Sequence, residues 1–236
     1  MKRHDGSISK AYRVARSGAD DGTEMAEAER GEMRLVPEKT DDRRQIGAVI
    51  PAAGMSSRMQ AFKPLLPFRD STVIECTAEA ALEAAPRVVV VLGNHADEVE
   101  RVLKKRFGDR LTIVRNPDYR STDMLYSVQI GLDALGKCDG FFLLPGDMPA
   151  VGSDTLKALV EAFDGEHRVI FPSCNGRKGH PPLIAASLIP AIRSYRGEGG
   201  LRAILSDVPQ KAIELGDKGI TTDLDTPEDY AAMLNN

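Results

Sequence analysis

The sequence predicts a three-layer α/β protein in which helices cover both faces of a doubly wound, mainly parallel sheet. Short apolar runs, such as 46–50 and 88–92, have the length and β-branched content of buried parallel strands. The segments between these runs carry apolar residues at helical spacing. Because ligands of such sheets bind beyond the carboxyl ends of the strands, we expect the functional side chains in the loops that follow the strands.

The first part of the domain alternates regularly between strands and helices. The expected strands are 46–50, 88–92, 111–114 and 141–144, and the expected helices are 72–85, 99–107 and 125–135. Thr72 and Glu75 have the spacing of a capping box, and Pro86 ends the helix that they begin. This alternation requires right-handed crossovers between neighbouring parallel strands.

The rest of the domain is less regular. We expect helices at 156–163, 188–195 and 201–205, strands at 169–171 and 211–215, and a hairpin-like insertion at 175–184. Thr226 and Pro227 have the residue types that begin a final helix. No internal repeat is visible, so a single domain at 46–236 accounts for the whole pattern.

Composition limits the classes of partner. The chain has 236 residues, of which 42% are hydrophobic, and a formal net charge of −4. This charge gives no reason to expect binding to nucleic acid or to an acidic membrane. The apolar runs are too short to span a bilayer and no secretory segment is visible, so a cytoplasmic location is expected. Cys76, Cys138 and Cys174 are too widely spaced for a disulfide framework or a zinc site.

Residues 1–45 differ from the rest of the chain. Acidic and basic residues are mixed there in equal numbers, and apolar residues are few. Such a composition buries too little surface to offset chain entropy, so we expect a disordered or partly helical tail. The basic residues near Met1 are compatible with an organelle transit peptide, and a strain-specific extension is the favoured alternative.

The segment after the first strand has the character of a phosphate-binding loop. It begins with a turn of small residues, Pro51, Ala52, Ala53 and Gly54, whose backbone N–H groups a ligand can approach closely. Arg58 and Lys63 follow in a proline-containing stretch, which indicates a shaped loop rather than a helix. The spacing matches neither the dinucleotide-binding glycine pattern nor the P-loop pattern. A surface turn with two solvated cations is the alternative.

Two acids stand where a metal ion could be held. Asp147 follows the strand 141–144 directly, and Asp225 precedes the final helix. If the backbone at 223–225 is extended, Asp223 and Asp225 project to the same side. Mg²⁺ prefers a few hard oxygen ligands together with waters and substrate phosphates, which two such carboxylates would provide. The alternatives are a turn-forming role for Asp147 and a helix-capping role for Asp225.

The pattern from Ala52 onward, Ala-Ala-Gly-x-Ser-x-Arg-Met-x-x-x-Lys-x-Leu-Leu-Pro, resembles the signature of the molybdenum cofactor cytidylyltransferases and their guanylyltransferase relatives. The resemblance covers about residues 46–232 and implies a nucleotide-diphospho-sugar-transferase-like fold. It implies that Arg58, Lys63 and Asp147 are catalytic and that Asp147 and Asp225 bind Mg²⁺. One departure is Gln60, which stands where the family usually has Gly.

The same resemblance extends the predicted site on both the nucleotide and the acceptor side. It assigns nucleotide binding to Pro51, Ala52, Ala53, Gly54, Ser56, Arg58, Lys63, Asn116, Met124 and Ser127. Asp123 replaces the Gly that usually precedes Met124. His180, in Gly-His-Pro, and Arg202, in Gly-Glu-Gly-Gly-Leu-Arg, resemble acceptor-binding residues. An ordinary hairpin histidine and a surface ion pair with Asp207 are the alternatives.

These assignments predict a Mg²⁺-dependent transfer of a nucleoside monophosphate from an NTP to a phosphate-bearing acceptor, with release of pyrophosphate. The attacking phosphate is already anionic, so no strong general base is required, and no convincing Ser–His or Cys–His pair is visible. The resemblance implies CTP as donor, molybdopterin as acceptor, and a molybdenum hydroxylase as the protein that receives the cofactor. The alternatives are a sugar or alditol phosphate as acceptor, and a non-catalytic nucleotide- or cofactor-binding module.

Overall fold

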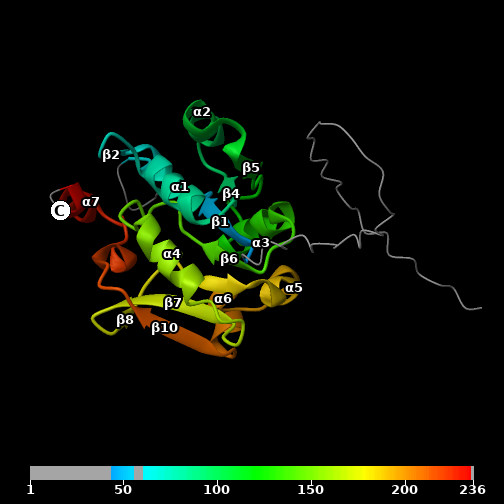
Figure 1. Cartoon of the computed structure of the whole chain (residues 1–236). Coiled ribbons are helices and arrows are strands. Elements are labelled where there is room, and N and C mark those ends of the chain that lie inside the picture. The colour runs from blue at the N-terminus through cyan, green and yellow to red at the C-terminus, as the bar shows by residue number, and fades with distance from the viewer. Residues whose placement is uncertain (1–43, 56–60, 235–236) are drawn as a thin grey trace, which may run out of the picture. The chain divides into compact units, whose positions relative to one another are not determined.

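The computed structural model describes residues 44–55 and 61–234 (Figure 1). The tail predicted at 1–45 lies outside the described residues except for its last two. Within the described part, the predicted class is confirmed: a mixed, mainly parallel sheet lies between two layers of helices. No helix of this part has the length and apolarity needed to cross a membrane.

The central part of the sheet is parallel, as the apolar runs predicted. It consists of β1 (Ile46–Ala52), β4 (Arg87–Leu92), β5 (Leu111–Arg115) and β6 (Gly140–Leu143). β1 pairs with β4 on one side and with β6 on the other, and β4 also pairs with β5. Nearly every residue of β1 and β4 is buried, because helices cover both faces of these strands.

The other part of the sheet contains the antiparallel pairs. It is built from β7 (Val169–Cys174), β8 (Arg177–Lys178), β9 (Leu183–Ala185) and β10 (Gln210–Glu214). The hairpin-like insertion predicted at 175–184 supplies β8 and leads into β9, which lies antiparallel between β6 and β7. β10 completes the sheet parallel to β7. The strand order β10-β7-β9-β6-β1-β4-β5 places β1 in the interior of the sheet, between β6 and β4.

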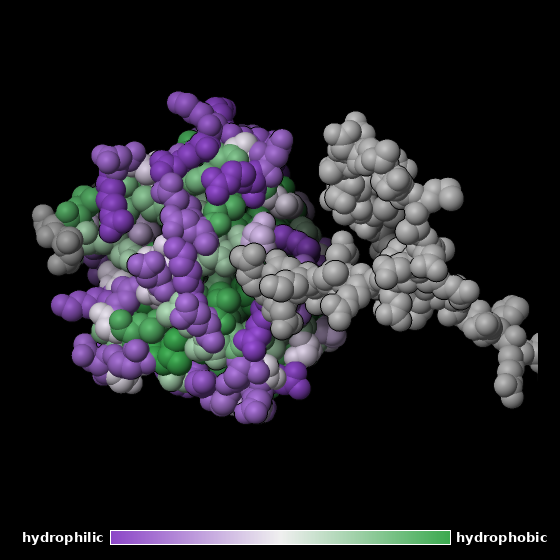
Figure 2. Space-filling model, in the orientation of Figure 1, coloured by the Kyte–Doolittle hydropathy of each residue, from purple (hydrophilic) through white to green (hydrophobic). Residues whose placement is uncertain are grey.

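Alternate residues of each central strand enter two different cores. On one face, Ala48 and Ile50 pack beneath α1 (Val73–Ala84), α2 (Ala96–Phe107) and α4 (Ser153–Glu161). On the other face, Val49 packs beneath α3 (Met124–Leu135), α5 (Ile189–Ser194) and α6 (Gly200–Ser206). Figure 2 shows hydrophilic side chains across the outward surface of the layer that contains α1 and α4, as expected for amphipathic helices.

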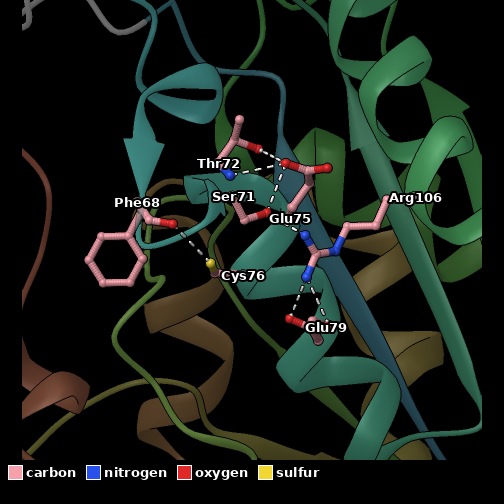
Figure 3. A network of polar contacts seen from close by, with 7 residues as sticks. All are labelled: Phe68, Ser71, Thr72, Glu75, Cys76, Glu79 and Arg106. Atoms are coloured by element: carbon pink, nitrogen blue, oxygen red, sulfur yellow. Dashed lines mark hydrogen bonds and ion pairs between the residues drawn. The ribbon is translucent and has the colours of Figure 1, made fainter.

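Polar contacts hold the start of α1 and join it to α2 (Figure 3). The Glu75 carboxylate accepts hydrogen bonds from the backbone N–H of Thr72 at 3.0 Å and from its hydroxyl at 2.7 Å. Arg106, on α2, donates to the Glu79 carboxylate at 2.9 and 3.0 Å and to the Ser71 hydroxyl at 2.8 Å. The spacing of Thr72 and Glu75 therefore predicted this helix start correctly.

A small third core links the loop after β1 to the end of the chain. The loop contains the 3₁₀ turn η1 (Lys63–Leu65), as expected of a shaped segment, and then the hairpin of β2 (Pro67–Phe68) and β3 (Ser71–Thr72). Phe68 and Val73 pack with Leu224 and Met233, the latter from α7 (Pro227–Leu234). Other 3₁₀ turns are η2 (Gly108–Arg110), η3 (Ala186–Leu188) and η4 (Lys218–Thr221).

The closest approach of α3 to the sheet occurs at Gly131. A Cβ atom there would lie 2.5 Å from Val49 Cγ1 and 2.9 Å from Val91 Cγ2. Gly131→Leu should therefore lower the free energy of unfolding by about 1–3 kcal/mol, because the added side chain overpacks a closed core. Chemical denaturation measures this change. Ala134→Leu, at an exposed position of the same helix, should stay within about 0.5 kcal/mol of the natural chain.

Candidate active site

A cavity of about 500 Å³ opens at the carboxyl edge of β1 and β6, where the sequence predicted the functional loops. It is lined by Pro51, Ala52, Ala53, Gly54, Met55, Lys63, Pro64, Tyr119, Thr122, Asp123, Met124, Ser127, Leu143, Pro145, Gly146, Asp147, His180, Asp223 and Asp225. These residues come from segments distant in sequence, and the sheet brings the segments together. Ser56 and Arg58 lie outside the described residues, so their predicted contacts with phosphates stay predictions.

The pairing of β1 with β6 continues past the ends of the strands and positions Asp147. The N–H of Leu144 donates to the carbonyl of Val49 at 3.1 Å, and the N–H of Gly146 donates to that of Pro51 at 3.1 Å. A Cβ atom on Gly146 would come within 2.9 Å of Ala52 Cβ, so only glycine allows this approach. The acid that follows is thereby held beside the small-residue turn.

The ammonium group of Lys63 joins the two predicted metal ligands. Its Nζ atom lies 2.8 Å from Asp225 Oδ1 and 3.6 Å from Asp147 Oδ2. Lys63 and Asp225 are 162 positions apart in the sequence. The Lys63 side chain is only 9% exposed, whereas those of Asp147 and Asp225 are 34% and 36% exposed and face the cavity. The fold thus brings Lys63 and both predicted acids together at one point.

A third acid, Asp223, also lines the cavity. Leu224 between the two acids is fully buried in the third core, and the alternation of an extended segment turns Asp223 and Asp225 toward the cavity. The Asp-x-Asp spacing had placed both acids on one side, yet it assigned no function to Asp223. Asp123 is a further acid of the lining, and its Oδ1 atom accepts the N–H of Tyr126 at 3.0 Å as the N-cap of α3.

The described lining is strongly acidic. Lys63 is its only Lys or Arg, against Asp123, Asp147, Asp223 and Asp225. Burial in the recess raises the pKa of Asp147 above its usual value; Lys63 opposes this shift, and the neighbouring acids Asp223 and Asp225 add to it. Removing an ionised carboxylate from water is unfavourable, so additional positive charge in the cavity would stabilise its ionised form.

The donor set suits a hard divalent cation. Within the described ranges, no three His, Cys, Asp or Glu side chains are arranged as a complete metal site. Two carboxylates beside an open cavity instead match the way Mg²⁺ is held, with the remaining positions taken by waters and substrate phosphates. Asp147 and Asp225 therefore fit the predicted metal, which they would hold together with oxygen atoms of a ligand.

The predicted nucleotide-binding residues fall into lining and supporting groups. Met124 and Ser127, in the first turns of α3, line the cavity. Asn116 is buried behind them, and its side-chain amide donates to the hydroxyls of Thr122 and Ser127, both at 3.0 Å. Asn116 does not line the cavity but orients two side chains that do. The loop 116–122 is held in this way against the start of α3.

The two predicted acceptor-binding residues are separated in the structure. His180 lines the cavity, and its backbone N–H donates to the carbonyl of Ile220 at 2.8 Å. Gly179 permits this contact, because a Cβ atom there would lie 2.4 Å from the same carbonyl oxygen. Arg202 lies exposed on α6 and is not part of the lining. The acceptor-binding role of each stays a prediction.

Comparison with known proteins identifies the family of this chain. Residues 48–213 match the MobA-like NTP transferase domain. The chain belongs to this family. The match includes Lys63 and Asp147 and ends before Asp225. As a MobA-like NTP transferase, the protein is a nucleotidyltransferase with the nucleotide-diphospho-sugar-transferase-like fold, which confirms both predictions.

Relatives of this MobA-like NTP transferase differ in their named activities. The molybdenum cofactor cytidylyltransferase of Escherichia coli (strain K12) is 30% identical over 188 residues, 78% of this chain and 93% of the relative. A probable molybdenum cofactor guanylyltransferase of Bacillus cereus (strain ATCC 10987 / NRS 248) is 32% identical over 138 residues, 58% of this chain and 66% of the relative. Nicotine blue oxidoreductase of Paenarthrobacter nicotinovorans is 30% identical over 200 residues, 80% and 96% of the two chains.

Among solved structures, a nucleotidyl transferase from Methanothermobacter thermautotroptrophicus superimposes with a TM-score of 0.70 at 28% identity. The similarity covers 81% of this chain and 96% of that one. The part of the chain that carries the cavity therefore has the architecture of a known nucleotidyl transferase.

The burial of Leu224 supports the position of the two acids beside it. Leu224→Ala should lower the free energy of unfolding by about 2–5 kcal/mol, because it opens a space in a fully buried core. Thermal or chemical denaturation measures the change. Leu234→Ala, at a position 52% exposed on α7, is the matched control and should have little effect. Equal effects of the two variants would contradict an anchoring role for Leu224.

Proposed function

We propose that this MobA-like NTP transferase moves CMP from CTP to the phosphate of molybdopterin, in a reaction that depends on Mg²⁺ and releases pyrophosphate. The observation that carries the proposal is that Lys63, Asp147 and Asp225 meet in the cavity that the small-residue turn also lines. The similarity to the Escherichia coli cytidylyltransferase extends over nearly all of that enzyme and supports the choice of substrates.

The reaction needs alignment and charge neutralisation more than proton transfer. An oxygen of the acceptor phosphate attacks the α-phosphorus of CTP; the new P–O bond forms as the bond to the bridging oxygen of pyrophosphate breaks. The nucleophile is already anionic, so none of the lining residues has to act as a strong base. The barrier then lies in bringing anions together in line, which a site for each substrate lowers.

Each residue of the site has a specific role in this proposal. The backbone of 51–54 approaches the triphosphate, since its small side chains leave the N–H groups accessible. Lys63 neutralises phosphate charge near the reacting centre. Asp147 and Asp225 hold Mg²⁺, which, when bound, offsets the charge of the α-phosphate and the departing pyrophosphate. Arg58 binds pyrophosphate and Arg202 the acceptor, two assignments that rest on the resemblance of their motifs.

The turn at the end of β1 favours the cytidylyl branch of the family, and hence CTP over GTP. This chain has Ala52-Ala53-Gly54 there, whereas guanylyltransferases usually carry a Gly-Gly pair. His180 on the cavity wall is assigned to the acceptor. A molybdenum hydroxylase that receives the finished dinucleotide cofactor, and a cytoplasmic location, complete the proposal.

The decisive experiment is pyrophosphate release with each of the four NTPs, with and without molybdopterin. Release that needs CTP, molybdopterin and Mg²⁺ together is the expected result. Release only with a sugar or alditol phosphate would identify that compound as the acceptor in place of molybdopterin. Release with GTP alone would identify GTP as the donor in place of CTP. Tight binding of nucleotide without any release would favour a binding module. Turnover of nicotine blue in the same preparations would favour the activity named for the oxidoreductase relative.

Asp147→Asn tests the predicted metal ligand. The substitution keeps the size of the side chain and removes its charge, so turnover should fall at least about a hundredfold while the fold persists. Pyrophosphate release at limiting Mg²⁺ measures the loss, and circular dichroism reports the fold. Asp154→Asn, at a fully exposed position of α4, is the control and should retain the natural rate. Full activity of Asp147→Asn at limiting Mg²⁺ would refute the assignment.

A further inference from the structure

The Lys63 ammonium lies where it interacts with both carboxylates that we assign to the metal. The distance of 2.8 Å to Asp225 is that of a hydrogen-bonded ion pair, and the distance of 3.6 Å to Asp147 is that of a longer electrostatic contact without a hydrogen bond. Lys63 is buried and is the first residue of the 3₁₀ turn η1, in the loop after β1. An internal cation therefore already compensates part of the charge of the two acids.

A divalent cation that approaches these acids alone has to displace or outcompete the ammonium. Displacement leaves the ammonium in a recess without compensation from Asp225, which is costly because the lysine is largely removed from water. A triphosphate changes this balance. Its oxygens offer the ammonium new anionic partners, and the flexible four-carbon stem of lysine allows the charged end to move between partners.

We propose that Lys63 acts as an internal counterion that opposes binding of free divalent metal and thereby couples metal binding to nucleotide binding. The inference rests on the proposed function, because it assigns Asp147 and Asp225 to the metal. By linkage, the factor by which nucleotide tightens metal binding equals the factor by which metal tightens nucleotide binding. The site then takes up metal and triphosphate together, and an acidic cavity does not fill with metal that would have no substrate to activate.

The test is a titration of Mn²⁺ at pH 8, followed by electron paramagnetic resonance of the free ion. It is done with and without a non-hydrolysable α,β-methylene analogue of CTP. In the natural chain, after subtraction of the Mn²⁺ that the analogue binds in a protein-free titration, the analogue should tighten Mn²⁺ binding by a factor of about 5 to 150, the usual range of such couplings. In Lys63→Met, Mn²⁺ alone should bind about tenfold more tightly than to the natural chain, and the effect of the analogue should shrink correspondingly.

Three variants serve as controls. Lys63→Gln removes the charge with a polar side chain and should behave as Lys63→Met does, so the test survives if one of the two fails to fold. Lys63→Arg keeps the charge and should keep weak binding of free Mn²⁺. Lys157→Met, which removes an exposed lysine of α4 that contacts Asp154 on the same helix and Glu83 on α1, should leave every affinity unchanged.

Two results would overturn the inference. One is Mn²⁺ binding to the natural chain that is equally tight with and without the analogue. The other is unchanged binding of free Mn²⁺ in both neutral variants when both are folded. Neither depends on turnover, so coupling observed without pyrophosphate release from any NTP would leave the inference standing and refute the proposed function instead. Pyrophosphate release without coupling would refute the inference and leave the proposed function standing.

Discussion

The ion pair between Lys63 and Asp225 is the interaction on which the geometry of the site depends. It joins two segments that are 162 positions apart, and neither segment belongs to the central sheet. The pair can form because the third core holds both segments: Leu66 and Phe68 follow the lysine, and Leu224 precedes the acid. Apolar packing of a small cluster thus determines where the charges of the site meet.

The central sheet supplies the rigid edge against which this pair is placed. β1 and β6 are buried on both faces, so their ends are fixed by packing from two cores. The hydrogen bonds from Leu144 and Gly146 extend this order into the loop of Asp147. The small-residue turn and the acid are therefore held together without a helix or a disulfide between them. Residues on rigid strand ends are suited to a reaction limited by alignment.

The electrostatics of the cavity support the proposed joint binding of a nucleotide and a metal ion. Four acids and one lysine among the described lining residues would repel a triphosphate that arrived without counterions. The same acids attract a divalent cation, and burial of Asp147 strengthens the advantage of added positive charge. In the proposed function, the acidic lining would make metal and nucleotide binding mutually dependent, whereas a purely cationic pocket would bind nucleotide alone.

Much of this arrangement was predictable from local patterns. The apolar runs at 46–50 and 88–92 predicted the strands, Thr72 with Glu75 predicted the start of α1, and the rule that ligands bind at the carboxyl edge placed the small-residue turn and Asp147. These features depend on neighbouring residues in the chain. The resemblance of short motifs to those of the family then assigned Lys63 and Asp225 to one site, as a cation and an acid. It gave no information on the distance between them.

Tertiary structure decided what depends on residues distant in sequence. It inserted β9 antiparallel between β6 and β7, because pairing there buries all three of its residues. It placed Asn116 behind the cavity and Arg202 outside it, although both belong to motifs resembling binding segments. It also turned Asp223 into the site by burying Leu224. Sequence alone therefore determined the class of fold and the types of residue available, because these follow from local periodicity and spacing. The contacts that make those residues one site depend on long-range packing, which local patterns do not encode.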